Sequence, residues 1–375
     1  MLRTIMTNLL HDFHQARGAR FGELNGAELV ADYGDPAAEH AALRTGAGVL
    51  DLSCRSRLCL LGADRVRFLH GQVTNDIKKL SPGAGAYAVL TTAKGKMESD
   101  LNIFLLADEI LLDFEPGLTG KISARLEKFI VADDVQIVDA APHYGLLSVQ
   151  GPRAAEVIHT VGWLGSVAPP ARPFDSVKIS DPALGDLYLA NLPRLGTAGF
   201  DLYVPNGSLA AAAAQLLAAA SPAGGRACGW TAFETARIEA GRPRYGADMD
   251  ETHLPLECGL ESRAVSYSKG CYIGQEVINR IHSVGHVNRE LRGLRLAAAL
   301  TALPVHGDKL FQGDREAGYV TSAVKSPVLN HPIALGFIRR EYNQTGNELT
   351  LRTAAGESRA IIVDLPFISV GGSTG

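Results

Sequence analysis

At residues 269–276 the chain reads Lys269-Gly270-Cys271-Tyr272-Ile273-Gly274-Gln275-Glu276, a segment that stands apart from its surroundings. Two glycines bracket the Cys-Tyr pair, which indicates a tight turn where the backbone comes close to another group. A helix can begin directly after this segment, over residues 277–281. We therefore expect a turn that holds Cys271 shortly before a helix N-terminus.

Cys271 has a sequence context that favours an ionised thiol. It precedes the expected helix N-terminus, lies two residues from Lys269 and has Arg280 nearby in the sequence, and these features lower a cysteine pKa. Because only the thiolate is a strong nucleophile or metal ligand, this interpretation makes Cys271 a reactive residue. The alternative is a buried cysteine that fills a small gap, since free cysteines usually lie inside proteins.

Composition and charge narrow the class of protein. The length of 375 residues fits two or three domains, and 46% hydrophobic with 20% charged residues suits packed cores. The net charge of -4 has the wrong sign for a surface that grips nucleic acid. The five cysteines are odd in number, scattered and without a Cys-x-x-Cys pair, so we expect reduced thiols rather than disulfides or a zinc site.

The sequence contains no segment typical of membrane insertion. No apolar run approaches the roughly 18 residues that a membrane helix needs. The Ala/Leu-rich segment over residues 208–220 is too short, and we expect it to be a packed helix. The first ten residues lack the small-residue cleavage site of a signal peptide. Together with the reduced cysteines, these features predict a cytoplasmic protein with no membrane partner.

Two segments of similar construction lie in the first half of the chain. Residues 61–70 and 150–159 both read as strand end, glycine and helix start, which two βα units would explain and chance would explain equally well. In the first of them Asp64 can cap a helix whose apolar residues continue to Leu80. Strands are expected over residues 87–91 and 101–114, the second folding back as a hairpin at residues 107–109.

Helical periodicity disappears after about residue 286. Short apolar segments separated by turn residues follow, at 291–296, 309–311, 318–322, 333–338, 348–352 and 359–363. This spacing predicts a small antiparallel β-barrel. We therefore divide the chain into residues 1–285 and a C-terminal barrel domain over residues 286–375.

The octapeptide, with Arg280 four residues after it, resembles the signature of the YgfZ-type folate-binding proteins, relatives of the glycine-cleavage T-protein. Further segments are similar to the T-protein superfamily, namely residues 50–53, 74–77, 93–100, 237–241, 245–252, 318–323 and 326–327. The resemblance covers about residues 40–370, and within it only the octapeptide is specific. It implies an α+β fold of three lobes, in which two intertwined βα-type lobes surround a folate cavity and an antiparallel β-barrel follows.

The resemblance also implies a function. YgfZ-type proteins bind a reduced folate and support iron–sulfur cluster assembly or repair, including that of enzymes that thiolate tRNA. Cys271 would be the reactive thiol, Lys269 and Arg280 would favour its thiolate, and Gln275-Glu276 would fix the turn. Partners would be iron–sulfur assembly or client proteins. One thiol cannot hold a cluster alone, so we expect no stable metal.

The folate, tetrahydrofolate or a derivative, would be bound by residues carried over from the resemblance, namely Asn75, Tyr87, Met97, Asp100 and Arg237. Asp100 lies near the catalytic Asp pair of the T-protein, whose first member is Ser99 here. A carboxylate beside the folate can stabilise positive charge or move a proton, and the alternative is an Asp in a turn network. Arg237 and Glu239 are two residues apart on a helix, so we expect one to brace the cavity and the other to point outward.

The second interpretation is a tetrahydrofolate-dependent aminomethyltransferase or methyltransferase. The T-protein takes an aminomethyl group from lipoyl-protein, transfers one carbon to tetrahydrofolate and releases ammonia. Its pterin is held by a glutamate where this chain has Thr197, and it has an arginine where this chain has Phe233. Both differences weaken this interpretation.

A third interpretation is direct tRNA binding through Lys78, Lys79, Lys94 and Lys96, and the negative net charge argues against it. Asp248, Asp250 and Glu251 resemble a metal cluster. They lack the glycine and the terminal glutamate of a calcium loop, so we expect no metal there either.

Overall fold

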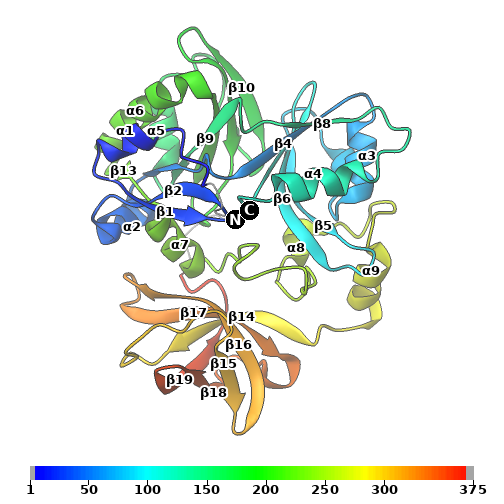
Figure 1. Cartoon of the computed structure of the whole chain (residues 1–375), viewed down its shortest axis with the longest axis vertical. Helices are drawn as coiled ribbons and strands as arrows, with labels where there is room; N and C mark the ends of the chain where they lie inside the picture. The colour runs from blue at the N-terminus through cyan, green and yellow to red at the C-terminus, as the bar shows by residue number, and fades with distance from the viewer. Residues whose placement is uncertain (1–4, 369–375) are drawn as a thin grey trace. The chain divides into compact units, whose positions relative to one another are not determined.

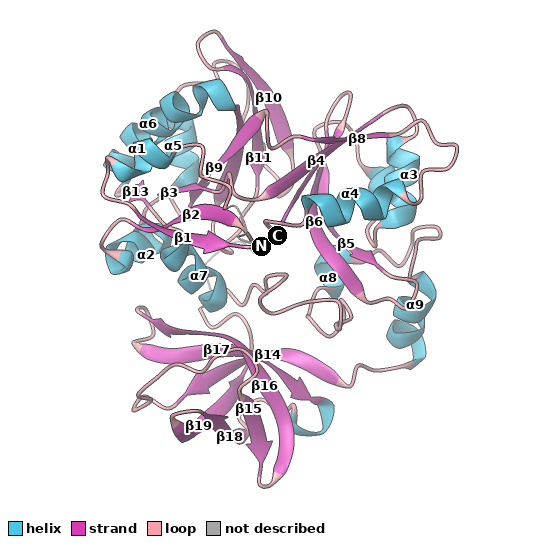
Figure 2. Ribbon diagram, viewed as in Figure 1, coloured by secondary structure: helices cyan, strands magenta, loops and turns pink. Residues whose placement is uncertain are grey.

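The structure, a computed structural model, describes residues 5–368 and divides into two compact units. Within the described residues, unit 1 contains residues 5–88 and 100–234, and unit 2 contains residues 89–99 and 235–368. Unit 1 combines helices with sheets, whereas a closed barrel of strands makes up much of unit 2 (Figure 2).

The first large sheet has the strand order β10-β11-β12-β9-β3-β13 (Figure 1). Its strands are β3 (Gly48–Asp51), β9 (Tyr144–Gln150), β10 (Ser176–Asp181), β11 (Gly185–Asn191), β12 (Gly199–Pro205) and β13 (Arg226–Ala227). Helices α5 (Ala154–Thr160) and α6 (Leu209–Ala220) pack against each other and against this sheet. Leu209, Ala212 and Leu216 are buried at helical spacing on α6, which confirms the packed helix predicted there.

The second large sheet has the strand order β5-β6-β7-β4-β8. Its strands are β4 (Ser56–Leu61), β5 (Gly85–Thr91), β6 (Met97–Leu105), β7 (Ile110–Phe114) and β8 (Gln136–Asp139). The amide of Leu106 donates to the carbonyl of Glu109 at 2.9 Å, which closes the β6–β7 hairpin predicted at residues 107–109. Helix α4 (Thr119–Glu127) packs on β4 and β8 and buries Ile122 and Leu126.

The two strand–glycine–helix segments predicted from the sequence are present. Strand β4 leads through Gly62 into α3 (Arg65–Gln72), and β9 leads through Gly151 into α5. Both glycines have a positive φ, 99° and 132°, which residues with a side chain rarely adopt. The repeat therefore reflects two βα segments that turn in the same way.

The helix predicted to continue to Leu80 is shorter than expected. Helix α3 ends at Gln72, Val73 is extended, and a 3-10 helix, η1, covers Ile77–Lys79. Val73 and Ile77 are fully buried, so the apolar spacing reflects burial in two separate segments rather than one helix. The Asp64 carboxylate does not cap the helix, because it accepts a hydrogen bond from the Asp134 amide at 3.0 Å.

The remaining elements of the described chain are α1 (His11–Gln15), β1 (Arg20–Leu24), β2 (Ala27–Asp32), α2 (Pro36–Thr45), η2 (Asn206–Ser208), η3 (Ser221–Ala223), α7 (Trp230–Glu239), α8 (Glu261–Ala264), α9 (Gln275–Val284) and η4 (Arg340–Tyr342). Strands β1 and β2 form an antiparallel hairpin. Among residues 5–368, no helix has both the length and the apolar character that a membrane crossing requires.

The C-terminal barrel closes in the order β14-β17-β16-β15-β18-β19. Its strands are β14 (Arg289–Leu296), β15 (Lys309–Gln312), β16 (Arg315–Ser326), β17 (His331–Arg339), β18 (Glu348–Thr353) and β19 (Gly356–Val363). Leu294, Val320, Ile338 and Leu351 are fully buried in its core. Every predicted strand of the barrel is found, so the α+β class with a C-terminal antiparallel barrel is confirmed. The domain boundary near residue 286 stays a prediction.

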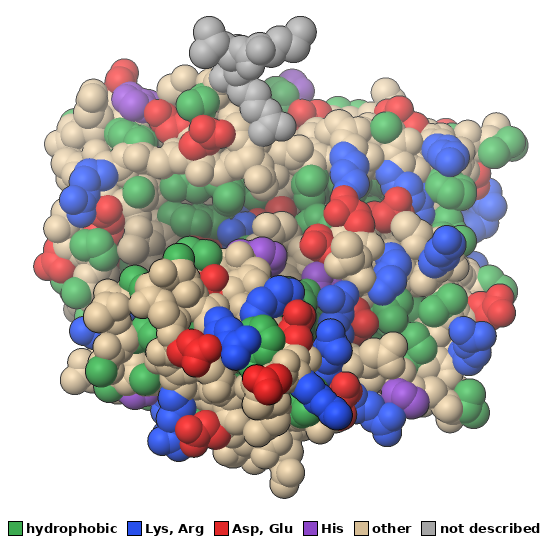
Figure 3. All heavy atoms as spheres, turned by 60° about the horizontal axis from the view of Figure 1, so that its bottom comes forward, with side chains coloured by type: hydrophobic (Ala, Val, Ile, Leu, Met, Phe, Trp, Pro, Cys, Tyr) green, Lys and Arg blue, Asp and Glu red, His purple; other side chains and the backbone are tan. Residues whose placement is uncertain are grey.

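Charged side chains of both signs share the face of the molecule that Figure 3 draws. On the face drawn in Figure 3, Lys and Arg side chains lie among Asp and Glu side chains rather than in a patch of one sign. In unit 2, for example, one open groove brings Arg289, Arg339 and Arg340 together with Glu257 and Glu341. This mixture differs from the one-sided basic footprint that nucleic-acid binders present.

Candidate functional site

The octapeptide forms a loop that leads into α9 in unit 2. Gly274 has φ +90°, and a Cβ at this position would lie 2.6 Å from both Thr91 Oγ1 and the Thr92 carbonyl oxygen. The Thr91 hydroxyl also donates to the Ile273 carbonyl at 2.5 Å. Only glycine suits such a close approach in this backbone conformation. The tight turn and the helix directly after it are therefore both present, as the sequence predicts.

Cys271 is exposed, whereas the other four cysteines, all within the described residues, are buried. The alternative of a buried, gap-filling Cys271 is therefore wrong. Lys269 is buried, and its ammonium nitrogen lies 4.7 Å from the centroid of the Tyr272 ring. Gln275 donates to the Lys269 carbonyl at 3.5 Å across the turn. The roles of Lys269 and Arg280 in ionising the thiol stay predictions.

Three of the predicted folate residues are joined by hydrogen bonds in unit 1. The Tyr87 hydroxyl donates to Asp100 Oδ2 at 2.8 Å, and Asn75 Nδ2 donates to the Tyr87 carbonyl at 2.9 Å. Strand β5 carries Tyr87 and strand β6 carries Asp100, so neighbouring strands bring the two side chains together. Tyr87 is buried, and the bond fixes the orientation of the Asp100 carboxyl.

The Asp100 carboxyl is poised to exchange a proton near neutral pH. The pKa of Asp100 is raised to about 6, chiefly by burial and also by the nearby charge of Glu115. The hydrogen bond from Tyr87 and the charge of Arg55 act in the opposite direction. A carboxyl with such a pKa is ionised at pH 7 yet takes up a proton readily, which is the property of a general acid–base group.

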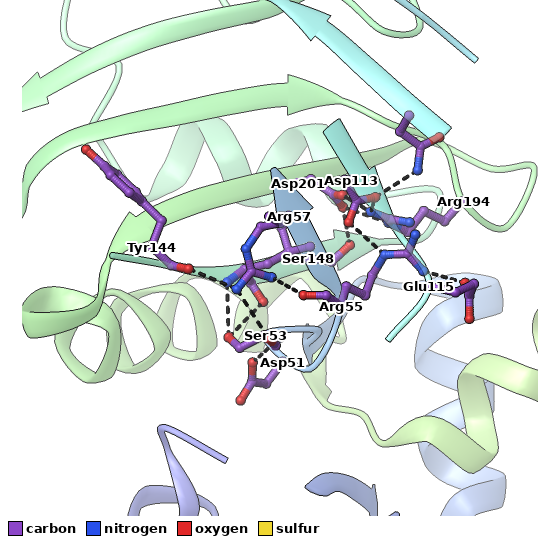
Figure 4. Close-up of polar contacts among 12 residues, drawn as sticks. Asp51, Ser53, Arg55, Arg57, Asp113, Glu115, Tyr144, Ser148, Arg194 and Asp201 are labelled. Atoms are coloured by element: carbon purple, nitrogen blue, oxygen red, sulfur yellow. Dashed lines mark hydrogen bonds and ion pairs between the residues drawn. The ribbon is translucent and has the colours of Figure 1, made fainter. Parts of the chain in front are cut away.

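A buried network of ion pairs lies in unit 1, and the sequence reasoning missed it. Arg55 Nε lies 2.8 Å from Asp113 and Arg55 Nη1 lies 2.6 Å from Glu115. Arg194 Nη2 lies 2.7 Å from Asp113 and 2.5 Å from Asp201 (Figure 4). Burial alone would raise the pKa of Asp113, but Arg55 and Arg194 outweigh burial and lower that pKa well below its ordinary value.

Met97 and Arg237 make contacts of a structural kind in unit 2. The Met97 sulfur lies 3.9 Å from Cys258 Sγ in the interior. Arg237 is buried, pairs with Asp248 and donates to Ser322 Oγ at 2.9 Å. Glu239 is also buried and accepts a hydrogen bond from Ser326, so the expectation that Arg237 or Glu239 points outward is wrong. The folate roles of Met97 and Arg237 stay predictions.

The acidic segment after α7 has structural partners. Asp248 binds Arg237 and accepts from the Thr321 hydroxyl at 2.5 Å, and Asp250 lies 2.7 Å from His253 Nδ1. Across residues 5–368, no group of three or more His, Cys, Asp or Glu side chains is arranged to hold a metal ion.

The two residues that depart from the T-protein pattern lie in unit 1. Thr197 is buried, and its hydroxyl has no hydrogen-bond partner within the described part of the chain. Phe233 is buried on α7 and its ring centroid lies 5.2 Å from that of Trp230. Thr197 therefore offers a hydroxyl that is free to bond, whereas Phe233 contributes to packing.

Comparisons with known proteins cover nearly the whole chain. Residues 10–269 match the family described as the GCVT N-terminal domain, and residues 289–368 match the glycine cleavage T-protein C-terminal barrel domain. A relative named aminomethyltransferase from Geobacillus thermodenitrificans is 30% identical over 352 residues, which is 93% of this chain and 94% of the relative. One of the same name from Cupriavidus necator is 29% identical over 384 residues, or 98% of each chain.

The crystal structure of glycine cleavage system aminomethyltransferase T from Bartonella henselae superposes with a TM-score of 0.86 at 24% identity, covering 97% of this chain and 98% of that chain. This likeness concerns the fold. The names of the relatives favour the transferase interpretation and give no support to the iron–sulfur assembly role, so the narrower YgfZ-type resemblance rests on the octapeptide alone.

Proposed function

Since the chain belongs to the glycine-cleavage T-protein family, we propose that it is a tetrahydrofolate-dependent one-carbon transferase, an aminomethyltransferase or a methyltransferase. One observation carries the proposal: the Tyr87 hydroxyl donates to Asp100 Oδ2 at 2.8 Å and so orients a carboxyl whose pKa is raised by burial. The relatives named aminomethyltransferase, which align over more than nine-tenths of this chain, support the same class of reaction.

Asp100 supplies the chemistry that such a transfer needs from the protein. In its ionised form the carboxylate stabilises positive charge that develops on a folate nitrogen, and it can also accept or return a proton. A positioned general acid–base group typically accelerates a reaction about 100- to 10,000-fold. Tyr87 and Asn75 act as positioning residues, because their hydrogen bonds hold the Asp100 carboxyl and the strand beside it.

Thr197 supports a pterin contact that is weaker than the one implied for the T-protein. Its buried hydroxyl has no partner among residues 5–368, so it can make one neutral hydrogen bond to a pterin N–H group. A carboxylate at this position would make a charge-assisted bond worth about 1.5–3 kcal/mol, more than a neutral one. We therefore expect this chain to bind tetrahydrofolate more weakly than relatives that keep the glutamate.

The exposure of Cys271 favours a second candidate function. An accessible thiol in the YgfZ-type octapeptide suits an accessory protein of iron–sulfur assembly, in which folate binding would be retained without turnover. The two candidates assign opposite importance to Asp100 and Cys271, so the same pair of variants separates them.

The test incubates the full chain with tetrahydrofolate and aminomethylated lipoyl-protein and measures methylenetetrahydrofolate. We expect turnover by the unmodified protein, a loss of about 100-fold or more in Asp100→Asn, and no change in Cys271→Ser. Folded state and tetrahydrofolate affinity are measured for each variant as controls. Folate binding without turnover in the unmodified protein would overturn the transferase proposal and favour the accessory role.

A further inference from the structure

The pairing of β6 with β7 gives Asp100 a second carboxyl group as a neighbour. On β6 the side chains of Glu98, Asp100 and Asn102 share one face, because successive residues of a strand point to opposite faces. Asn102 lies opposite Asp113 on β7. The same antiparallel register, continued by two residues on each chain segment, brings Glu115 opposite Asp100. Cross-strand neighbours of this kind have Cβ atoms about 4.5–5.5 Å apart.

The pairing of β4 with β7 extends this row to Arg55. Continued by one residue on each segment, that register brings Arg55 opposite Glu115. The ion pairs agree with it: Arg55 Nη1 lies 2.6 Å from Glu115, and Arg55 Nε lies 2.8 Å from Asp113 (Figure 4). On the other side of Asp100, β5 supplies the Tyr87 hydroxyl. One row across the neighbouring strands β5, β6, β7 and β4 therefore contains Tyr87, Asp100, Glu115 and Arg55.

The two carboxyl groups of this row have different surroundings. Glu115 is 4% exposed and pairs with a guanidinium, which stabilises its negative charge. Asp100 is partly exposed and accepts a hydrogen bond from the neutral hydroxyl of Tyr87. Burial and the charge of Glu115 raise the pKa of Asp100, and the Tyr87 bond and the charge of Arg55 lower it. Paired carboxyl groups whose surroundings differ in this way divide the roles of fixed charge and proton exchange between them.

A fixed negative charge beside Asp100 has two effects on the proposed reaction. It opposes the ionisation of Asp100, so Asp100 can take up and return a proton near neutral pH. It also adds to the negative charge that Asp100 presents to a folate nitrogen on which positive charge develops. Glu115 is buried, and it exerts both effects through its electric field without touching the substrate.

We propose that Glu115 is a positioning residue for the transfer reaction: held by Arg55 opposite Asp100, it is the fixed negative member of a carboxyl pair in which Asp100 exchanges the proton. The role in catalysis rests on the proposed function, whereas the pair itself is a property of the sheet. The competing explanation is that Glu115 serves only as a counter-ion for the buried Arg55. That explanation predicts no effect of Glu115 on the titration of Asp100.

Carbon-13 NMR titration of the carboxyl carbons in Glu115→Gln tests the pair without any turnover. Glutamine keeps the length of the side chain and an acceptor oxygen for Arg55, and it removes the charge. The pKa of Asp100 should fall by about one unit, because a like charge within about 6 Å has been removed. Glu109→Gln is the matched control: Glu109 lies at the turn of the same β6–β7 hairpin and should leave the Asp100 midpoint unchanged. An unchanged midpoint in Glu115→Gln overturns the proposal.

The unmodified protein provides a second test that does not depend on the folding of a variant. The side-chain carboxyl carbon of Glu115 should keep the chemical shift of an ionised carboxylate while Asp100 titrates. A Glu115 that takes up a proton together with Asp100 overturns the division of roles. Glu115→Asp keeps the charge and should retain most of the raised pKa of Asp100, which separates the effect of charge from that of packing.

The pH–rate profile links the pair to the reaction. If the Asp100 midpoint falls from about 6 to about 5 in Glu115→Gln, the fraction of plateau turnover that remains at pH 5 should rise about fivefold. A midpoint that moves in NMR while the acid limb of the profile stays in place overturns the role of Glu115 in the reaction. A midpoint that moves in a protein without turnover supports the carboxyl pair and contradicts the transferase proposal instead.

Discussion

Replacing Tyr87 by phenylalanine isolates the bond that orients Asp100. The hydroxyl of Tyr87 donates to Asp100 Oδ2 at 2.8 Å, and this bond lowers the pKa of a carboxyl that burial has raised to about 6. Tyr87 is only 8% exposed, so Tyr87→Phe leaves the ring in its packing site and removes one donor. The pKa of Asp100 should therefore rise further in the variant.

The size of the change follows from the strength of the bond. A hydrogen bond to a charged group contributes about 1.5–3 kcal/mol, and one pKa unit corresponds to about 1.4 kcal/mol. Tyr87→Phe should thus raise the pKa of Asp100 by about one to two units. At pH 7 the carboxyl would change from mostly ionised to at least half protonated, and folate-dependent turnover at that pH should fall with it.

Carbon-13 NMR titration of the carboxyl carbons measures this pKa directly, and Asp100→Asn assigns the resonance. Tyr342→Phe serves as the control, because Tyr342 lies in η4 of the barrel and should not affect Asp100. The acid limb of the pH–rate profile should move upward by the same amount as the NMR midpoint. An Asp100 midpoint that stays in place or falls in Tyr87→Phe would refute this reasoning.

Three further predictions concern stability. Asp113→Asn should lower the free energy of unfolding by about 3–5 kcal/mol in urea melts, because Arg55 and Arg194 lose a shared buried partner. Asp186→Asn is the control: it breaks an exposed ion pair with Lys178 and should lower the free energy of unfolding far less. Gly274→Ala should lower the free energy of unfolding more than Gly246→Ala does. Both glycines have a positive φ, but of the two only Gly274 has other atoms within 4 Å of the position a Cβ would take. Similar losses of stability in the two variants would contradict the close approach at Gly274. The pKa of Asp100 is raised in the folded state, so the protonated carboxyl favours folding; this contribution is complete below about pH 4 and is lost as the pH rises through about 6. Asp100→Asn should therefore raise the free energy of unfolding by up to about 3 kcal/mol at pH 7 and leave it unchanged at low pH. A change in stability that is the same at every pH in thermal melts would contradict the raised pKa of Asp100.

The barrel and the octapeptide turn were predictable because their signals are local. Each barrel strand is a short apolar segment bounded by turn residues, and the glycines at 270 and 274 mark the turn before α9. The helix predicted to continue to Leu80 shows the limit of such signals. Val73 and Ile77 keep helical spacing but are buried from an extended residue and a 3-10 turn.

The ion network of unit 1 could not be predicted, because its members are far apart in the sequence. Arg55 and Asp113 are separated by 58 residues, and only strand pairing between β4 and β7 brings their segments together. One signal was available: Asp113 interrupts the apolar strand from Ile110 to Phe114, and a charge inside such a strand indicates a buried ion pair. The identity of its partners is set by the fold.

The most direct test of the transferase account is the stoichiometry of a single turnover. Ammonia and methylenetetrahydrofolate are measured together after the protein is mixed with aminomethylated lipoyl-protein, with and without tetrahydrofolate. The account predicts that the two products appear in equal amounts, and only when tetrahydrofolate is present. Ammonia release that does not depend on tetrahydrofolate, or tetrahydrofolate that is bound and recovered unchanged, would contradict it.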